Sequence, residues 1–235
     1  MFTPVGPPNN YAITSGNGTD CVTSAVVAYD ASPTNAEGLG PQSITLIRTP
    51  LPFLQSNFAG TPGANLTTNV PTIGGAWTDI NTNPMLLVTG GFVRAGGSGF
   101  EFLVSNAAAP PSADYSAKIT LTELSAVGHA GVASRVIDAS NFLRVEYNET
   151  SGAYELIQRI TGGDTILGSF THTISGAEVI EIITAGSNVS AKLNGTQIIA
   201  PVATALAAAG VVAVWAKNSL ANDSTGLHMS SLEAT

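Results

Sequence analysis

The sequence predicts an all-β protein, an antiparallel β-sandwich or jelly roll that follows an extended N-terminal segment. Short runs of β-branched and aromatic residues recur at spacings of about 8–12 residues, which is typical of sandwiches. The 25 glycines and 13 prolines fall between these runs, where turns are expected. No long stretch has the apolar period of an amphipathic helix, so helices are not expected to contribute a layer.

Three segments in the middle of the chain alternate apolar and polar residues, as strands with one face in a core do. They are residues 117–124, 142–147 and 154–160. Because alternate side chains point to opposite faces, we expect polar members such as Arg144 and Glu146 on a solvated face.

Turn signals separate the strands that follow. Residues 148–152 and 161–164 are turn-like, and Asn194-Gly195 is the dipeptide most typical of a two-residue hairpin. The alanine-rich stretch 202–209 is compatible with a short helix or a loop. Further strands are expected at 165–170, 178–184, 187–193, 196–199, 211–215 and 227–232.

Residues 1–56 differ in composition from the rest of the chain. They contain seven of the 13 prolines and two strand-like runs, 23–29 and 43–48. Fully extended, a 50-residue arm would span about 165 Å, whereas a folded domain of 180 residues has a radius of gyration of about 16 Å. Either this segment reaches beyond its own domain to other subunits, or its strands pair with the sandwich.

Composition excludes several classes of partner. The formal net charge is −8, and no two basic residues are adjacent, so nucleic acid is not expected as a ligand. The start of the chain lacks the basic region of a secretory signal. The most apolar stretch, 198–216, contains Pro201 and Gly210, which favours two short strands over a membrane span.

Metal and cofactor chemistry is weakly signalled. Cys21 is the single cysteine, so it forms neither an internal disulfide nor a thiolate metal site on its own. Asp79 with Asn81, or Asn222 with Asp223, could supply oxygen ligands to calcium, but such pairs are more typical of turns. We expect neither a metal nor a cofactor.

Catalytic residues are also not apparent. Glu178 and Glu181 are three positions apart, so they point to opposite faces of a strand. Glu146 and Glu149 straddle a strand end, where we expect both to be solvated. The histidines are far apart in the sequence and join no nucleophile motif. We expect that the protein is not an enzyme.

From Asn57 onward, a series of short glycine-containing and aromatic segments follows a recognisable order. The segments are Gly74-Gly75-Ala76-Trp77-Thr78, Gly90-Gly91, residues 113–117, 131–135, 141–143 and 154–156, and Val189 to Gly195. In this order residues 57–235 resemble the laminin G-like, concanavalin A-like jelly rolls of tailed-phage proteins and bacterial surface proteins. The resemblance implies a division into an N-terminal arm or added strands, 1–56, and a jelly roll, 57–235.

The resemblance implies a virion structural protein: a capsid decoration, cement or head-fibre subunit on the outer capsid surface. Its expected partners are the major capsid protein or other virion subunits, and a homo-oligomer is expected because closed symmetry buries apolar surface. The candidate contact residues are Phe2, Pro4, Tyr11 and Phe53.

The alternative function is that of a glycan-binding, lectin-like module for host or cell-surface attachment. Sugars stack on aromatic rings, and Trp77, Tyr147 and Tyr154 are the candidates, whereas Trp215 lies in an apolar run and is expected in the core. Glucanases with this architecture carry closely spaced acids on one strand, and this chain lacks that motif.

Arg135 and Asp138 flank a turn and are expected to pair across it.

Overall fold

The computed structural model describes residues 2–4, 11–13, 51–97, 99–123, 128–217 and 222–235. The chain divides into two units, residues 1–51 and 52–235. In the first unit, β1 (Phe2–Pro4) pairs antiparallel with β2 (Tyr11–Ile13), so that Pro4 lies opposite Tyr11. Cys21 and the strand-like runs 23–29 and 43–48 lie outside the described residues.

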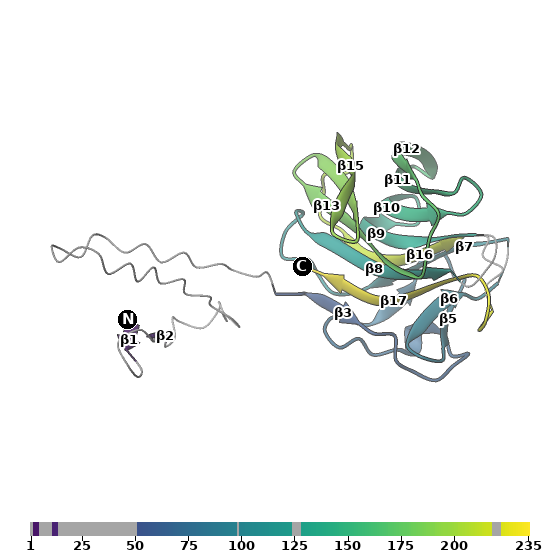
Figure 1. The fold of residues 1–235 in the computed structure, drawn as a ribbon, viewed down its shortest axis with the longest axis horizontal. Helices are drawn as coiled ribbons and strands as arrows, with labels where there is room; N and C mark the ends of the chain where they lie inside the picture. The colour runs from purple at the N-terminus through teal and green to yellow at the C-terminus, as the bar shows by residue number, and fades with distance from the viewer. Residues whose placement is uncertain (1, 5–10, 14–50, 98, 124–127, 218–221) are drawn as a thin grey trace. The chain divides into compact units, whose positions relative to one another are not determined.

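The second unit consists of two antiparallel sheets, which confirms the predicted all-β sandwich (Figure 1). The seven-stranded sheet has the order β12-β11-β10-β9-β16-β7-β4, and the eight-stranded sheet has the order β15-β14-β13-β8-β17-β6-β5 with β3 paired to β17. The strands of the first sheet are β4 (Trp77–Asp79), β7 (Glu101–Asn106), β9 (His129–Asp138), β10 (Asn141–Asn148), β11 (Ala153–Ile160), β12 (Gly163–Thr171) and β16 (Val211–Lys217). Those of the second are β3 (Leu54–Ser56), β5 (Met85–Val88), β6 (Phe92–Ala95), β8 (Ser116–Glu123), β13 (Ala177–Ala185), β14 (Asn188–Leu193), β15 (Thr196–Ala203) and β17 (Leu227–Ala234).

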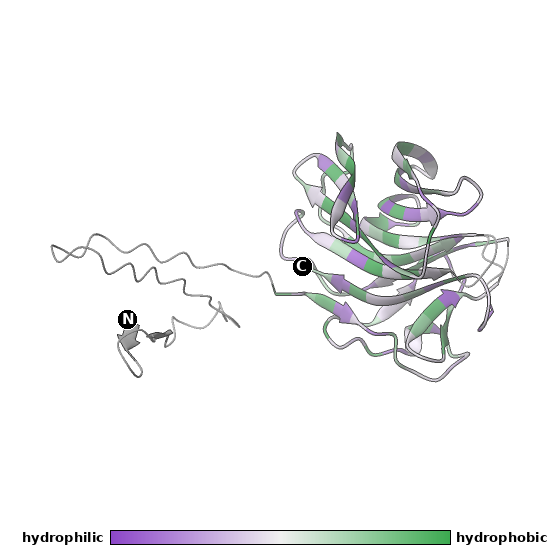
Figure 2. Ribbon diagram, viewed as in Figure 1, coloured by the Kyte–Doolittle hydropathy of each residue, from purple (hydrophilic) through white to green (hydrophobic). Residues whose placement is uncertain are grey.

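The main core lies between the two sheets, and strand alternation builds it. On β8, Ala117, Ile119 and Leu121 are fully buried, while Lys118 and Thr120 face outward and are partly exposed. Figure 2 shows this alternation of hydrophobic and hydrophilic residues along the strands. The predicted strand over 117–124, with one solvated face, is therefore confirmed for its described residues; Leu124 lies outside them.

The predicted turns occur where glycine and its neighbours adopt left-handed conformations. Asn194 (φ 49°) and Gly195 (φ 81°) join β14 to β15, and Thr161 (φ 49°) and Gly162 (φ 82°) join β11 to β12. Positive φ at both central residues gives the turn a twist that matches the flanking strands. The stretch 202–209 is not helical: β15 ends at Ala203, and residues 204–210 form an irregular connection to β16.

The sandwich begins earlier than the sequence suggests. β3 pairs with the last strand, with Ser56 opposite Leu232, and the division between the two units falls after Leu51 instead of after residue 56. Phe53, a predicted capsid contact, is half-buried and packs edge-on against Tyr115 with ring centroids 5.5 Å apart.

Arg135 does not pair with Asp138, and the prediction of a pair across the turn is wrong. A bulge with φ 48° at Arg135 turns its fully buried side chain away from Asp138. Its guanidinium donates to the carbonyl oxygens of Ala113, Leu206 and Gly186 at 2.6–3.1 Å, and its carboxylate partner at 3.3 Å is Asp114. A buried charge needs such partners. The Arg135 guanidinium therefore links three loops: the one before β8, the β13–β14 turn and the connection between β15 and β16.

Candidate functional site

A second cluster of buried residues lies on the outer face of the seven-stranded sheet, the face turned away from the main core. Its neighbours along the strands, such as Val132, Leu143 and Val214, belong to the main core, so the sheet itself separates the two clusters. The cluster consists of Leu103, Ala133, Val136, Phe142, Ala213 and Trp215. Because these side chains are buried, another part of the protein must cover this outer face of the sheet.

Curvature of the sheet provides this shelter. Arg159 on β11 and Glu101 on β7 form two hydrogen bonds of 2.5 and 2.8 Å. These strands are four steps apart in the sheet order, and strands lie about 4.8 Å apart, so a flat sheet would separate them by roughly 19 Å. That is farther than the two side chains reach, so the sheet curls around its outer face. We call this face the concave face.

Small residues line the middle of the concave face: Gly131, Ala133 and Ala213. A Cβ atom on Gly131 would lie 2.0 Å from the carbonyl oxygen of Val145, so this position accepts no side chain. The small residues leave room for the long side chains of neighbouring strands to lie along the sheet.

Arg144 and Trp215 occupy that room. The Arg144 guanidinium carbon lies 4.3 Å from the centre of the Trp215 ring, a cation–π arrangement. Arg144 Nε donates to Glu146, whose other oxygen lies 2.8 Å from Nδ1 of His129. Gly131 separates Trp215 from Glu146 in the register of the sheet. The indole Nε1 of Trp215 is buried and finds no hydrogen-bond partner among the described residues.

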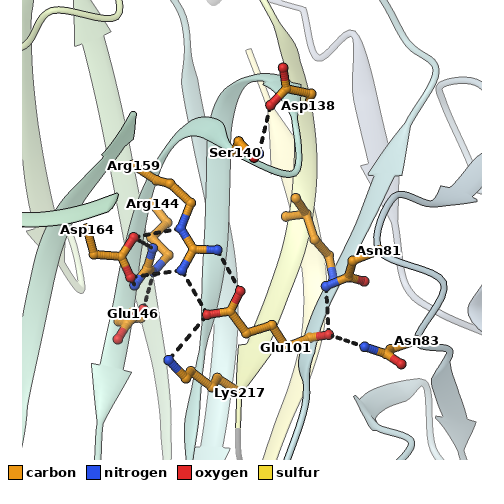
Figure 3. A network of polar contacts seen from close by, with 11 residues as sticks. Asn81, Asn83, Glu101, Asp138, Ser140, Arg144, Glu146, Arg159, Asp164 and Lys217 are labelled. Atoms are coloured by element: carbon orange, nitrogen blue, oxygen red, sulfur yellow. Dashed lines mark hydrogen bonds and ion pairs between the residues drawn. The ribbon is translucent and has the colours of Figure 1, made fainter. Parts of the chain in front are cut away.

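A network of ion pairs covers these groups (Figure 3). Both oxygens of Asp164 accept hydrogen bonds from Arg144 at 3.0 and 2.9 Å and from Arg159 at 2.7 and 2.9 Å. Arg159 continues to Glu101, and Lys217 Nζ lies 3.2 Å from the same carboxylate. With Glu146, these six residues form what we call the concave-face network, which contains three cations and three carboxylates.

The cations lower the pKa of two carboxylates of the network, Glu101 and Asp164. Hydrogen bonds from Arg159, together with its charge and that of Lys217, lower the pKa of Glu101 from 4.5 to about 2 against the opposing effect of burial. Burial alone would raise the pKa of Asp164, but hydrogen bonds from Arg159 and Arg144 outweigh it and hold that pKa well below its usual range. The hydrogen bonds that Arg159 donates to Glu101 and Asp164 raise the pKa of Arg159 in turn.

The rim of the concave face is polar and carries one exposed aromatic ring. Phe100 precedes Glu101 directly, and 58% of its surface is exposed. The main-chain carbonyl of Glu101 accepts hydrogen bonds from Asn81 Nδ2 at 2.6 Å and Asn83 Nδ2 at 2.8 Å (Figure 3). Planar amide, guanidinium and carboxylate groups thus gather at Glu101, one residue from an exposed aromatic residue in the sequence, a combination suited to hydroxyl-rich ligands.

The three rings predicted for sugar stacking lie inside the core. Trp77, Tyr147 and Tyr154 are exposed by 4%, 3% and 0%, so none offers a ring face to a ligand in this structure. The Trp77 indole donates to Asn69 at 3.2 Å, and the Tyr154 hydroxyl donates to Glu178 at 2.6 Å. A glycan site in this structure must therefore use other residues.

Two further predictions are corrected. Glu146 is only 1% exposed, so the expectation that it is solvated is wrong; the curvature of the sheet covers it. Trp215 is buried as predicted, but in the cluster on the concave face instead of the core between the sheets.

Sequence reasoning missed the concave-face network, although a signal was present. Only 10% of the residues are charged, yet β10 and β11 carry charges of both signs on one face: Arg144 and Glu146, two positions apart, then Glu155 and Arg159, four apart. Because charged residues are rare in this chain, their concentration on β10 and β11 indicates that these two strands contribute to a polar site. The contributions of Glu101, Asp164 and Lys217 depend on the tertiary structure.

The other polar candidates lie elsewhere. Asp79 accepts a hydrogen bond from Asn65 at 3.1 Å, and Asp223 pairs with Arg94 at 3.1 Å. Within the described part of the chain, no three His, Cys, Asp or Glu side chains are grouped so as to hold a metal ion. No helix among the described residues is long and apolar enough to cross a membrane.

Solved structures share the fold. No family model matches the chain, and no curated protein matches it. A carbohydrate-binding module, CBM66 from Bacillus subtilis, matches with a TM-score of 0.56 and 12% identity over 68% of this chain and 96% of its own. The GH43 protein BlXynB from Bacillus licheniformis matches with a TM-score of 0.56 and 13% identity over 82% of this chain, which spans 41% of that protein.

A glycosyl hydrolase family protein from Mycobacterium fortuitum matches with a TM-score of 0.52 and 10% identity, over 79% of this chain and 100% of its own. At these identities the likeness establishes the fold alone. The chain therefore has the jelly-roll β-sandwich fold that concanavalin A-like domains adopt.

Proposed function

We propose that residues 52–235 form a carbohydrate-binding domain whose site is the concave face and its rim. The observation that carries this proposal is the concave-face network, six charged side chains held on one curved surface, with the exposed residue Phe100 next to Glu101 in the sequence. Protein sites for polar ligands combine such aromatic surface with a few fixed hydrogen-bonding groups. Aromatic rings contact the apolar faces of sugars, and planar polar side chains bind their hydroxyl groups.

The cost of burying charges supports a functional role. Arg144 and Glu146 are 3% and 1% exposed, and desolvation of such pairs often cancels their attraction. Apolar residues at these positions would stabilise the sheet at least as well. Strongly perturbed carboxylates such as Glu101 also gather at functional sites more often than elsewhere.

The structural neighbours are consistent with this class of ligand. One is named a carbohydrate-binding module, and two others are glycoside hydrolase proteins. The site described here has its own residues, so these names support the ligand class and not a particular sugar.

The capsid role stays a prediction. Attachment to the major capsid protein or another virion subunit, the homo-oligomer and the outer capsid location draw on residues 1–56, most of which lie outside the described part of the chain. A virion subunit that displays a glycan-binding face would satisfy both functions.

The test is glycan binding by the full chain on a panel of neutral and acidic oligosaccharides, followed by calorimetry. We expect at least one glycan to bind and Phe100→Ala to weaken its binding about tenfold, which corresponds to roughly 1.4 kcal/mol. The matched control is Phe170→Ala on β12. Phe170 is also partly exposed, but it lies opposite Tyr154 and thus on the core side of the sheet.

Both variants change exposed rings and are expected to fold, which thermal unfolding will check. Absence of binding to every glycan contradicts the proposal. If the two variants weakened glycan binding equally, the binding site would not lie on the concave face.

A further inference from the structure

The concave face already holds an anion, the protein's own Glu101. Two Arg159 nitrogens donate to the two Glu101 oxygens at 2.5 and 2.8 Å, which is the bidentate geometry of guanidinium and carboxylate. Lys217 contacts the same carboxylate at 3.2 Å. Arg159 and Lys217 thus form a preformed receptor for one carboxylate group.

We infer that the ligand is an acidic glycan, and that the carboxylate of a uronic acid residue replaces Glu101 on Arg159 and Lys217. This inference rests on the proposed carbohydrate-binding function and specifies its substrate class. Glu101 then acts as an internal competitor that leaves when the acidic sugar binds.

Arg159 remains oriented when Glu101 leaves. Asp164 holds the Nε and one terminal nitrogen of Arg159 at 2.7 and 2.9 Å, and Arg144 fixes Asp164 from the other side. The Arg159 guanidinium also lies over the ring of Phe142, 5.1 Å from its centre. A cation held by partners other than the exchanged group is preorganised for a new anion.

Glu101 is the member of the network best placed to exchange. The side chains of Glu101 and Asp164 are 29% and 30% exposed, but Asp164 accepts hydrogen bonds from two arginines, whereas Glu101 is held by Arg159 and Lys217. The main chain of Glu101 is fixed by Asn81 and Asn83, so the side chain can rotate away while β7 stays in place. Next to it, a Cβ on Gly97 or Gly99 would meet nothing within 4 Å, so this rim has open space.

Charge balance favours an anion at this position. Removal of Glu101 leaves Arg159 with Asp164 alone and takes from Lys217 the carboxylate that lies 3.2 Å from its Nζ. An acidic ligand restores the balance, whereas a neutral one leaves a partly buried cation unpaired.

A sugar fits better than an acidic peptide. Phe100 directly precedes Glu101 in the chain and is 58% exposed, so its ring is free to contact the apolar face of a sugar. A flat ring beside hydrogen-bonding groups suits a pyranose ring that carries both a carboxylate and hydroxyl groups.

The experiment compares the wild-type chain with Glu101→Gln and with the control Glu233→Gln. Glu233 pairs with Lys118 at 2.7 Å on the other sheet, and its side chain is 27% exposed, close to the 29% of Glu101. Calorimetry measures binding of uronic acid oligosaccharides, of the same oligosaccharides after reduction of the carboxyl groups, and of an oligoglutamate.

We expect Glu101→Gln to bind the uronic acid series about tenfold more tightly than wild type, because the competing carboxylate is gone. The reduced series is expected to show no gain, and Glu233→Gln is expected to behave as wild type. Thermal unfolding verifies that each variant is folded.

The failures are distinguishable. If the reduced series binds and Glu101→Gln changes nothing for the acidic series, the acidic-sugar inference is overturned and the carbohydrate-binding function stands. If folded wild type and Glu101→Gln bind no oligosaccharide of either series, the acidic-sugar inference fails, and absence of binding to every glycan of the wider panel overturns the carbohydrate-binding function as well. An equal gain for oligoglutamate would show selection of anions without recognition of sugar, and would also overturn the inference.

Discussion

The outer faces of the two sheets differ, although their strands carry the same alternating pattern. On β8 of the eight-stranded sheet, the outward Lys118 has a 42% exposed side chain and pairs with Glu233 beside an open groove of about 400 Å³. On β10 of the seven-stranded sheet, the outward Arg144 and Glu146 are almost completely buried.

The difference teaches that the alternation of side chains determines which face of a sheet a residue occupies, but not whether that face is exposed to solvent. Curvature brings β7 and β11 close enough for Arg159 to reach Glu101 across the concave face. The same residue types therefore form weak surface pairs on one sheet and a buried network on the other. The following predictions test this difference between the two outer faces, in order of decreasing expected effect.

The largest effect is expected for Arg144→Ala. The change leaves Glu146 without its arginine and Asp164 with Arg159 alone, and breaking a buried ion pair costs about 3–5 kcal/mol. The counterpart Lys118→Ala is expected to cost less than about 1 kcal/mol, because that pair is exposed. Urea unfolding measures both values. Equal costs would show that the two faces do not differ in energy.

Gly131→Ala is expected to destabilise the sandwich by about 2–3 kcal/mol, since the new methyl group would overlap the main chain of β10. Gly97→Ala is the control, because a Cβ there meets nothing within 4 Å. Thermal and urea unfolding of the two variants provide the measurement. If Gly131→Ala were tolerated as well as the control, β9 and β10 would lie farther apart than the structure shows.

Glu101→Gln tests the pH dependence of the concave-face network. The folded pKa of Glu101, about 2, lies below its ordinary 4.5, so the stability it contributes is present above pH 4.5 and is lost as the pH falls toward 2. We expect Glu101→Gln to cost about 2 kcal/mol at pH 7, after allowance for solvent screening at this partly exposed site. This cost should shrink as the pH falls toward 2.

Urea unfolding across that pH range, with Glu233→Gln alongside, measures the effect. A cost that does not change with pH would mean that Glu101 acts through packing instead of through its charge.

The smallest effect is expected for the coupling between Lys118 and Glu233. A double-mutant cycle with alanine should give about 0.5 kcal/mol at 0.1 M salt and close to zero at 1 M, where the Debye length falls to about 3 Å. A coupling above about 2 kcal/mol, unaffected by salt, would place this pair in the same class as the buried network.

Much of the fold was predictable because strand signals are local. The alternation in 117–124, the turns at 148–152 and 161–164, and the Asn194-Gly195 hairpin each depend on neighbouring residues. The structure confirms them, except that Gly163 and Asp164 already belong to β12 and Leu124 lies outside the described residues. The pair of Arg135 with Asp138 was not predictable, because a bulge reverses the direction of Arg135.

The candidate site was only partly predictable. The charges on β10 and β11 were visible in the sequence, whereas the partner Glu101 comes from a strand four steps away in the sheet. Aromatic residues were a poor guide, because Trp77, Tyr147 and Tyr154 were chosen as sugar-stacking rings and lie in the core. A ring's exposure depends on what packs over it, and single-sequence patterns do not contain that information.

The sequence by itself determined the all-β sandwich, the position of most strands and turns, and the division of each strand into two faces. These features follow from side-chain periodicity and turn chemistry, which act over a few residues. The tertiary structure alone decided which outward face is sheltered and which charges meet on it. Those outcomes depend on the curl of a seven-stranded sheet, which brings residues 58 positions apart, Glu101 and Arg159, into one ion pair.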